Sequence, residues 1–274
     1  MKRPSIRVLI LLVVLAIMLA ACGGTTSSSG GSSPGQSINP VTLNVFAASS
    51  LTESFGVIKT QYEKAHPQDK IVYNFNGSQI LAQQINSGAN ADIFASADQT
   101  NMQKVASEVN TPQVFVKNRL TVITPASNPG KITSLQDLSR SGVKLVLAAP
   151  SVPVGKYALQ VLDNMGKSSE YGPAYESAVK ANVVSQEDNV KAVVQKVQLG
   201  EADAGIVYTT DVTVAVSNQV KFITIPDNYN VIASYPIAAL KDSKHESDAQ
   251  AFVNYVLSPA GQQVLAQYHF ITVK

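Results

Sequence analysis

The chain has 274 residues, of which 45% are hydrophobic and 15% charged, and it contains three histidines and one cysteine. Its formal net charge is +2, but three of its 21 lysines and arginines lie in residues 1–21; without that segment 18 basic residues face 19 acidic ones, giving −1. A nearly neutral chain offers no electrostatic basis for binding nucleic acid. A single cysteine excludes an intramolecular disulfide.

The N-terminal segment predicts a lipoprotein signal peptide over residues 1–21. Lys2, Arg3 and Arg7 precede an uncharged apolar run over 8–21, which is shorter than the about 20 residues that a membrane-spanning helix needs. The sequence Leu-Ala-Ala-Cys that ends at Cys22 resembles the bacterial lipobox, whose cysteine is lipidated and becomes the mature N-terminus. We therefore expect an extracytoplasmic protein anchored to the cell membrane by lipid on Cys22. The alternative is a stray cysteine in an ordinary signal peptide.

A flexible tether is predicted over residues 22–38. Residues 23–35 are all glycine, serine, threonine or proline, and a stretch without apolar residues cannot bury a core. The part of the chain from Asn39 onward is long enough for one large domain or two smaller lobes.

From residue 41 onward, short apolar runs alternate with stretches of helical periodicity. The first half of the pattern predicts strands and helices in this order: strand 41–47, helix 51–66, strand 71–75, helix 79–86, strand 92–95, helix 97–109 and strand 119–124. The second half predicts a turn at 135–138, strand 144–148, helix 155–165, strand 182–184, helix 189–199, strands 204–207, 220–225 and 231–240, and helix 247–268.

The repetition of strand, short loop and helix predicts an α/β fold of mostly parallel sheets with helices on both faces. The pattern restarts after the strand at 119–124, and the strand at 231–240 leads back. We therefore predict two lobes, the first formed by residues 41–122 and 232–274 and the second, inserted lobe by residues 123–231.

Four of the predicted strands end in a polar or tight turn from which a helix starts at once. The four sequences are FAASSLT, FNGSQ, APSVPVGK and SQEDNVK. Helix starts that follow parallel strands lie at the ligand-binding edge of a sheet, and their free N–H groups attract anions. Ser50 and Ser78 could each add a hydroxyl donor. The structural alternative is a capping box formed by Ser50 and Glu53.

Six ordered segments carry a resemblance to a known family: FAASSLTESF, FNGSQILAQQI, ADIFASAD, VPVGKYAL, EDNVKAVV and AGIVYTTD. They resemble the molybdate-binding proteins of ABC importers (the ModA family), and the likeness covers nearly all of residues 41–274. The resemblance implies that the hydroxyls and amides of Ser50 and Ser78, the amides of Val154 and Val190, and the phenol of Tyr208 bind the oxyanion. Ser49 stands where family members often carry alanine, so it is either a silent neighbour or a further donor.

The resemblance also implies the fold and the role of the protein. The fold would be a two-lobed periplasmic-binding-protein fold of type II with the ligand in the cleft between the lobes. The protein would be the solute-binding component of an ABC importer, a monomer that passes molybdate or tungstate to a permease and its ATPase. It would hold molybdenum only as the oxyanion, with no direct metal–ligand bond and no cofactor, and would not be an enzyme.

Neutral donors suit this ligand chemically. Molybdate at neutral pH is a tetrahedral dianion whose oxygens only accept hydrogen bonds, whereas hydrogen phosphate keeps a proton that needs an acceptor. Backbone amides offer none, although serine and tyrosine hydroxyls can rotate to accept. Sulfate is also an acceptor-only dianion, so only its smaller size would exclude it.

Three other functions are weighed against this one. An enzyme would use Ser50 or Ser78 as a nucleophile, but neither lies in a G-x-S-x-G or Ser-x-x-Lys motif. A metal-ion receptor would need a ligand cluster, whereas His66, His245 and His269 are scattered. Another cargo on the same fold, such as sulfate, thiosulfate or a small organic anion, is the closest alternative. No arginine falls in the six segments to clamp an organic anion.

Overall fold

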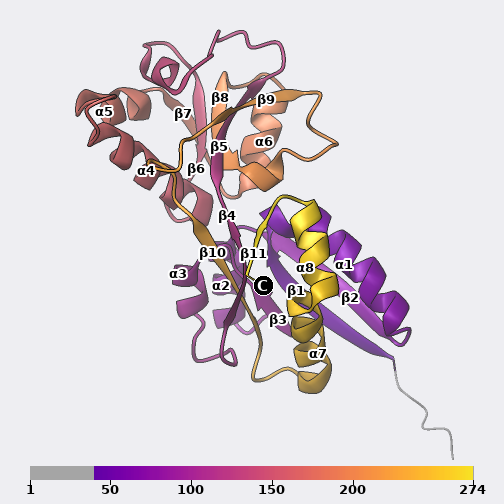
Figure 1. Ribbon diagram of the computed structural model, residues 1–274. Helices are drawn as coiled ribbons and strands as arrows, with labels where there is room; N and C mark the ends of the chain where they lie inside the picture. Colours follow the sequence, from indigo (N-terminus) through magenta and orange to yellow (C-terminus); the bar gives the residue numbers. More distant parts are fainter. Residues whose placement is uncertain (1–39, 274) are drawn as a thin grey trace, which may run out of the picture. The chain divides into compact units, whose positions relative to one another are not determined.

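The computed structural model describes residues 40–273 (Figure 1), and within them the strands form two sheets. The first sheet has the order β11-β4-β10-β3-β1-β2 and contains β1 (Val41–Ala48), β2 (Asp69–Asn76), β3 (Ile93–Ala95), β4 (Gln113–Asn118), β10 (Ala233–Ala239) and β11 (Ile271–Thr272). The second has the order β7-β6-β8-β5-β9 and contains β5 (Leu120–Pro125), β6 (Leu145–Ala148), β7 (Val183–Glu187), β8 (Ala204–Tyr208) and β9 (Val220–Thr224). Both sheets belong to one compact unit.

Helices cover both faces of the first sheet. On one face lie α1 (Thr52–Ala65), α7 (Glu246–Leu257) and α8 (Pro259–Gln267), and on the other lie α2 (Ser78–Asn86) and α3 (Gln99–Gln103) (Figure 1). Strand β1 shows why: Leu43 and Val45 pack in the cluster that contains Phe252 of α7, whereas Phe46 packs with Leu81 of α2. A parallel strand that is apolar on both sides needs cover on both sides.

The second sheet is covered by α4 (Pro153–Gly166) and α5 (Ala174–Ala181) on one side and by α6 (Val190–Gln198) on the other (Figure 1). A short turn, η2 (Leu135–Ser139), packs against α5. The helical segments of this half begin and end close to the predicted positions, apart from α5, which was not predicted. No helix within residues 40–273 is both long enough and apolar enough to cross a bilayer.

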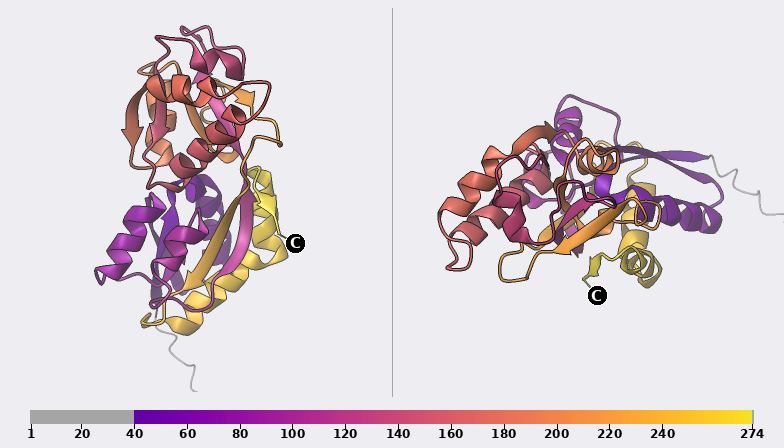
Figure 2. Two further views of the ribbon diagram at one scale, coloured as in Figure 1. Left: turned by 90° about the vertical axis from the view of Figure 1, so that its left-hand side faces the viewer. Right: turned by 90° about the horizontal axis from the view of Figure 1, so that it is seen from above.

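Two chain crossings connect the sheets, and they run side by side (Figure 2). Strands β4 and β5 are separated by Arg119 alone, and the chain returns through residues 225–232 to β10, which pairs with β4. The side chain of Asn230 holds the crossings together, because its Oδ1 accepts from the Leu120 amide at 3.1 Å and its Nδ2 donates to the Leu120 carbonyl at 2.9 Å.

The predicted α/β class is confirmed, but the sheets are mixed rather than mostly parallel. Strands β1, β2 and β3 are parallel, as are β6, β7 and β8. Strand β10 runs antiparallel to β3 and β4, β11 antiparallel to β4, and β5 antiparallel to β8 and β9. The antiparallel pairs arise because the crossing strands do not follow the strand–helix–strand repeat.

Two predicted helices differ from the structure. The helix predicted over 97–109 is regular only in α3, and the helix predicted over 247–268 is two helices, α7 and α8. The residue before a proline avoids the α region, and Ser258, which precedes Pro259, has ψ 164°. Its Oγ then caps α8 by accepting from the Gly261 amide. Strands β4 and β11 were also not predicted.

The predictions for residues 1–21, the tether over 22–38 and Cys22 lie outside the described residues. The lobe boundaries at 122 and 232 stay a prediction, although the change of sheet occurs at Arg119 and at the return to β10.

Candidate functional site

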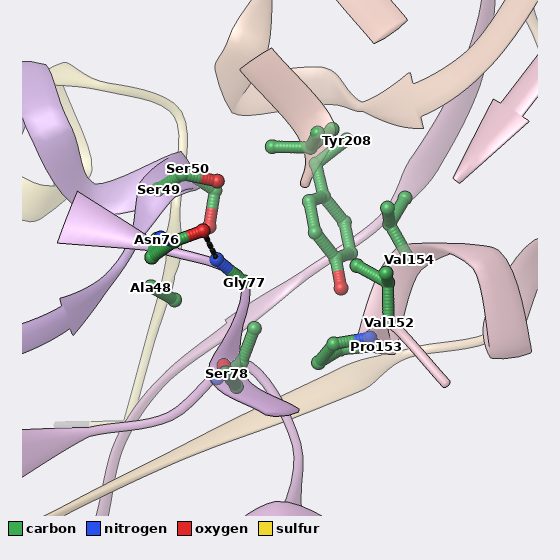
Figure 3. Close-up of a pocket in the computed structure, with 12 residues that line it drawn as sticks. Ala48, Ser49, Ser50, Asn76, Gly77, Ser78, Val152, Pro153, Val154 and Tyr208 are labelled. Atoms are coloured by element: carbon green, nitrogen blue, oxygen red, sulfur yellow. Dashed lines mark hydrogen bonds between the residues drawn. The ribbon is translucent and has the colours of Figure 1, made fainter. Parts of the chain in front are cut away.

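One pocket collects every predicted ligand residue of the described part of the chain (Figure 3). It lies where the ends of β1, β2 and β8 meet the starts of α2, α4, α6 and the short helix η1 (Ser49–Leu51). The lining residues are Ala48, Ser49, Ser50, Asn76, Gly77, Ser78, Ala97, Val152, Pro153, Val154, Val190 and Tyr208. Residues from both sheets therefore face the same space.

The helix starts around the pocket present N–H groups to it. No side chain caps η1, α2 or α4, so their first-turn amides, including those of Ser50, Ser78 and Val154, have no capping acceptor within residues 40–273. At α6, Asn189 caps the helix, because its Oδ1 accepts from the amide of Ala192 at 3.1 Å. Uncapped first turns carry partial positive charge and can bind an anion.

Two glycines allow these helix starts to come close. A Cβ on Gly77 would lie 2.4 Å from the carbonyl oxygen of Asp188, which precedes α6 on the other side of the pocket. A Cβ on Gly155, in the first turn of α4, would lie 2.2 Å from the carbonyl oxygen of Ala149. Any larger residue at either position would push a helix start away from the pocket.

The two serine hydroxyls each make one hydrogen bond to the protein. Ser78 Oγ accepts from the Ala97 amide at 3.0 Å, and Ser50 Oγ lies 3.0 Å from the phenol oxygen of Tyr235. Both serines are buried. The capping box considered for Ser50 and Glu53 is wrong, since neither side chain caps the helix and Glu53 binds Lys191 instead.

The phenol of Tyr208 has no hydrogen-bond partner among the described residues, although Tyr208 is only 1% exposed. Its hydroxyl points into the pocket (Figure 3). Burial, and then the neighbouring Tyr235, raise the pKa of Tyr208 well above its usual value, so the phenol keeps its proton. Buried polar groups are nearly always paired, so a buried, unpaired O–H aimed into a pocket indicates a ligand that accepts hydrogen bonds.

No charged side chain is among the described residues that line the pocket. Two lysines lie close by, but acidic groups hold them. Lys191 Nζ donates to Glu53 at 2.8 Å and lies 3.3 Å from the fully buried Asp211. Burial lowers the pKa of Lys191, but Asp211 and Glu53 raise it by more, so the net shift is upward and the ammonium group stays charged.

The second lysine, Lys156, also reaches across to the first sheet. Its Nζ lies 2.6 Å from Thr100 Oγ1 and 3.7 Å from the buried carboxylate of Asp98. Together with the hydrogen bond from Gln79 Nε2 to the Asp188 carbonyl (2.8 Å), these contacts join the two sides of the pocket.

The pocket is small and has no metal ligands. Its cavity volume is about 10 Å³, far below the roughly 300–1,000 Å³ of pockets for drug-sized molecules. The described residues contain no group of three or more histidines, cysteines or carboxylates that could hold a metal ion. None of the three histidines lines the pocket. The space and its lining therefore suit a compact anion.

Sequence reasoning missed two polar residues near the ligand space. Asn76 lines the pocket and fixes the turn before α2, since its Oδ1 accepts from the Gly77 amide at 2.8 Å. The Asn-Gly pair was the available signal for it. Tyr235 contacts Ser50 from a position 185 residues away, and no local pattern marks that contact.

Comparisons with known proteins agree with this arrangement. Residues 43–271 match the family of bacterial extracellular solute-binding proteins. The molybdate-binding protein ModA of Mycobacterium tuberculosis is 36% identical over 243 residues, which are 87% of this chain and 88% of that protein.

Two solved structures share the fold. The periplasmic molybdate-binding protein of Azotobacter vinelandii has a TM-score of 0.73 at 19% identity, covering 85% of this chain and 100% of that one. The sulfate-binding protein SubI of Mycobacterium tuberculosis has a TM-score of 0.75 at 17% identity, covering 85% and 88%. At these identities the likeness shows the fold alone, and the predicted two-lobed type II fold is confirmed. The chain belongs to the family of bacterial extracellular solute-binding proteins.

Proposed function

We propose that this protein is the extracytoplasmic solute-binding component of an ABC importer and that it binds molybdate in the pocket between the two sheets. The observation that carries the proposal is the unpaired, buried phenol of Tyr208, which faces uncapped helix starts and two serine hydroxyls across a pocket without charged lining residues. The likeness to the molybdate-binding ModA protein supports the choice of ligand.

The chemistry of the donors fits a dianion that only accepts hydrogen bonds. Ser50, Ser78 and Tyr208 supply O–H donors, and the amides of Ser50, Ser78, Val154 and Val190 supply N–H donors. Hydrogen bonds to charged groups contribute about 1.5–3 kcal/mol each. Several such bonds, with the partial charges of the helix starts, would offset the cost of removing the ion from water.

The proposal extends to tungstate, which has nearly the same size and charge as molybdate. It also includes lipid anchoring through Cys22, function as a monomer without a cofactor, and delivery of the ion to a membrane permease driven by an ATPase. Ser49, which lines the pocket beside Ser50, would act as an additional donor.

A second candidate is the same pocket binding sulfate or thiosulfate. Sulfate is also an acceptor-only dianion, and the fold is equally close to that of a sulfate-binding protein. An organic anion is disfavoured, because the lining lacks a cation and the volume is small.

Titration calorimetry of the protein with molybdate, tungstate, sulfate and phosphate tests the proposal. We expect tight binding of molybdate and tungstate, at least tenfold weaker binding of sulfate, and the weakest binding for phosphate. Ligand at 100 times its dissociation constant should stabilise the fold by about 2.7 kcal/mol in thermal melts. Tighter binding of sulfate would establish the second candidate, and no melting shift with millimolar molybdate or tungstate would refute the proposal.

A matched pair of variants ties the binding to this pocket. Ser78→Ala removes one buried donor and should weaken molybdate binding by at least about 10-fold. Ser217→Ala removes an exposed hydroxyl that contacts only the Val214 carbonyl and should leave the affinity unchanged. Equal affinities in the two variants would place the ligand elsewhere.

A further inference from the structure

A buried chain of hydrogen bonds leads from the crossing between the sheets to the pocket. Asn118, the last residue of β4, donates from Nδ2 to the phenol oxygen of Tyr235 at 3.3 Å. That oxygen lies 3.0 Å from Ser50 Oγ, which lines the pocket. Asn118 and Tyr235 are fully buried. Tyr235 does not itself line the pocket but contacts two residues that do, Ser50 through this hydrogen bond and Tyr208 through edge-on ring packing.

The backbone sets the direction of the first bond in this chain. The Arg119 amide donates to Asn118 Oδ1 at 2.9 Å, and an amide can only donate, so the Nδ2 of Asn118 must face Tyr235. The Tyr235 oxygen therefore accepts from Asn118. Either oxygen of the next pair could donate, but the phenol is the more acidic group and the stronger donor, which favours the direction from Tyr235 to Ser50 Oγ. Burial raises the pKa of Tyr235, so the phenol keeps its proton. Ser50, having accepted, has its own proton free for the pocket.

Ser78 is constrained in the same sense by a different group. Its Oγ accepts from the amide of Ala97 at 3.0 Å, and no other hydrogen bond to this Oγ occurs within residues 40–273. The Ser78 proton is thus also left for the pocket. In both serines, the contact that Oγ makes with the protein favours donation of its proton to the pocket.

We propose that Tyr235 is a positioning residue that fixes the Ser50 hydroxyl as a donor, and that it thereby helps the site to select oxyanions without a proton. An anion that carries a proton needs an acceptor in the pocket. Tyr235 is the one hydrogen-bond partner of Ser50 Oγ within residues 40–273, so if Ser50 accepted from the anion, its own proton would have no acceptor unless Tyr235 gave up its role as donor. This inference rests on the proposed function and refines it, since it assigns part of the selectivity to a residue outside the pocket.

The test uses Tyr235→Phe, which keeps the ring that packs edge-on against Tyr208 and Phe270 at 5.7 Å and removes only the hydroxyl. The matched control is Tyr175→Phe, because Tyr175 is a buried tyrosine whose phenol donates to the Leu135 carbonyl, and neither residue lines the pocket. We expect the molybdate dissociation constant to rise by about 3- to 10-fold in Tyr235→Phe and to stay unchanged in the control.

A double-mutant cycle separates positioning from a general loss of stability. Ser50→Ala should weaken molybdate binding by at least about 10-fold in the wild-type protein, and by clearly less in Tyr235→Phe, where Ser50 is no longer oriented. If the affinity losses of the two single variants simply multiply in the double mutant, the inference is overturned. A molybdate affinity of Tyr235→Phe within about twofold of the wild type would also overturn it.

Selenate and hydrogen arsenate provide a second readout, measured by their displacement of bound molybdate at mildly alkaline pH. They are similar in size and charge and differ by one proton. We expect the wild type to prefer selenate and Tyr235→Phe to show a smaller preference for it. An unchanged preference would overturn the inference. If neither anion displaces molybdate, the double-mutant cycle decides. A wild-type protein that binds neither molybdate nor tungstate would overturn the proposed function and this inference with it. If the wild type binds molybdate but the affinity losses of Ser50→Ala and Tyr235→Phe multiply in the double mutant, only this inference is overturned.

Discussion

Replacing Tyr208 by phenylalanine should move ligand affinity and fold stability in opposite directions. In the bound state the variant lacks one charge-assisted hydrogen bond, which contributes about 1.5–3 kcal/mol. The molybdate dissociation constant should therefore rise by about 10- to 150-fold. Without ligand, the phenol is buried and unpaired, and an unpaired buried polar group destabilises a fold by about 1–3 kcal/mol. Its removal should leave the ligand-free protein as stable as before or more stable.

The assay combines titration calorimetry with thermal melting in the presence and absence of molybdate. Tyr175→Phe serves as the control, because it deletes a phenol that is buried and paired with the Leu135 carbonyl at 2.6 Å. Loss of that bond, about 1 kcal/mol, should lower the melting temperature by about 2–4 °C and leave the molybdate affinity unchanged.

The opposite pattern would refute the assignment of Tyr208. If Tyr208→Phe melts at a lower temperature without ligand while its molybdate affinity equals that of the wild type, the phenol serves the core and not the ligand. A loss of affinity accompanied by an equal loss of ligand-free stability would also count against the reasoning, since the structure gives the phenol no protein partner within residues 40–273.

Three further outcomes are expected. Glu53→Gln removes the carboxylate 2.8 Å from Lys191. This half-exposed ion pair contributes about 1 kcal/mol or less, so the molybdate affinity should fall by up to about fivefold at low salt. An unchanged affinity at low salt would show that the ion pair does not support binding. The hydrogen bond from the Thr133 amide, partly opposed by burial, lowers the pKa of Asp137 from 3.8 to about 2. Because the folded pKa lies below the unfolded one, this carboxylate stabilises the fold above pH 3.8 and ceases to do so as the pH falls toward 2. The melting temperatures of the wild type and Asp137→Asn should therefore converge in acid, and a difference that stays constant with pH would contradict this. Cys22→Ala should move the protein from the membrane fraction to the soluble fraction, and retention in the membrane would exclude the lipid anchor.

The sequence could predict that the proposed ligand residues share a pocket because each lies at a local junction. Ser50, Ser78 and Val190 stand where an apolar strand ends and a periodic helix begins, and parallel strands place such junctions at one edge of a sheet. Tyr208 ends a strand of the same kind. Local patterning and the strand–helix repeat together imply that these residues meet, and the pocket contains all of them.

The remaining features depend on contacts between distant segments. Strand β10 pairs antiparallel with β3 and β4, and its position places Tyr235 beside Ser50; neither the pairing nor the register is encoded within a short window. The break between α7 and α8 is different, because Pro259 marks it in the sequence and the residue before a proline rarely continues a helix.

The placement of the two lysines bears on the selectivity that the proposed function expects of the pocket. A lysine that touched the ligand would attract any anion, protonated or not, because a point charge does not distinguish an acceptor from a donor. Lys156 and Lys191 lie in the first turns of α4 and α6, next to the amides that face the pocket. Each pairs with a carboxylate from a helix that covers the first sheet, Lys156 with Asp98 at the start of α3 and Lys191 with Glu53 of α1. Their charges hold the two sides of the pocket together, and under the proposed function recognition would be left to neutral donors.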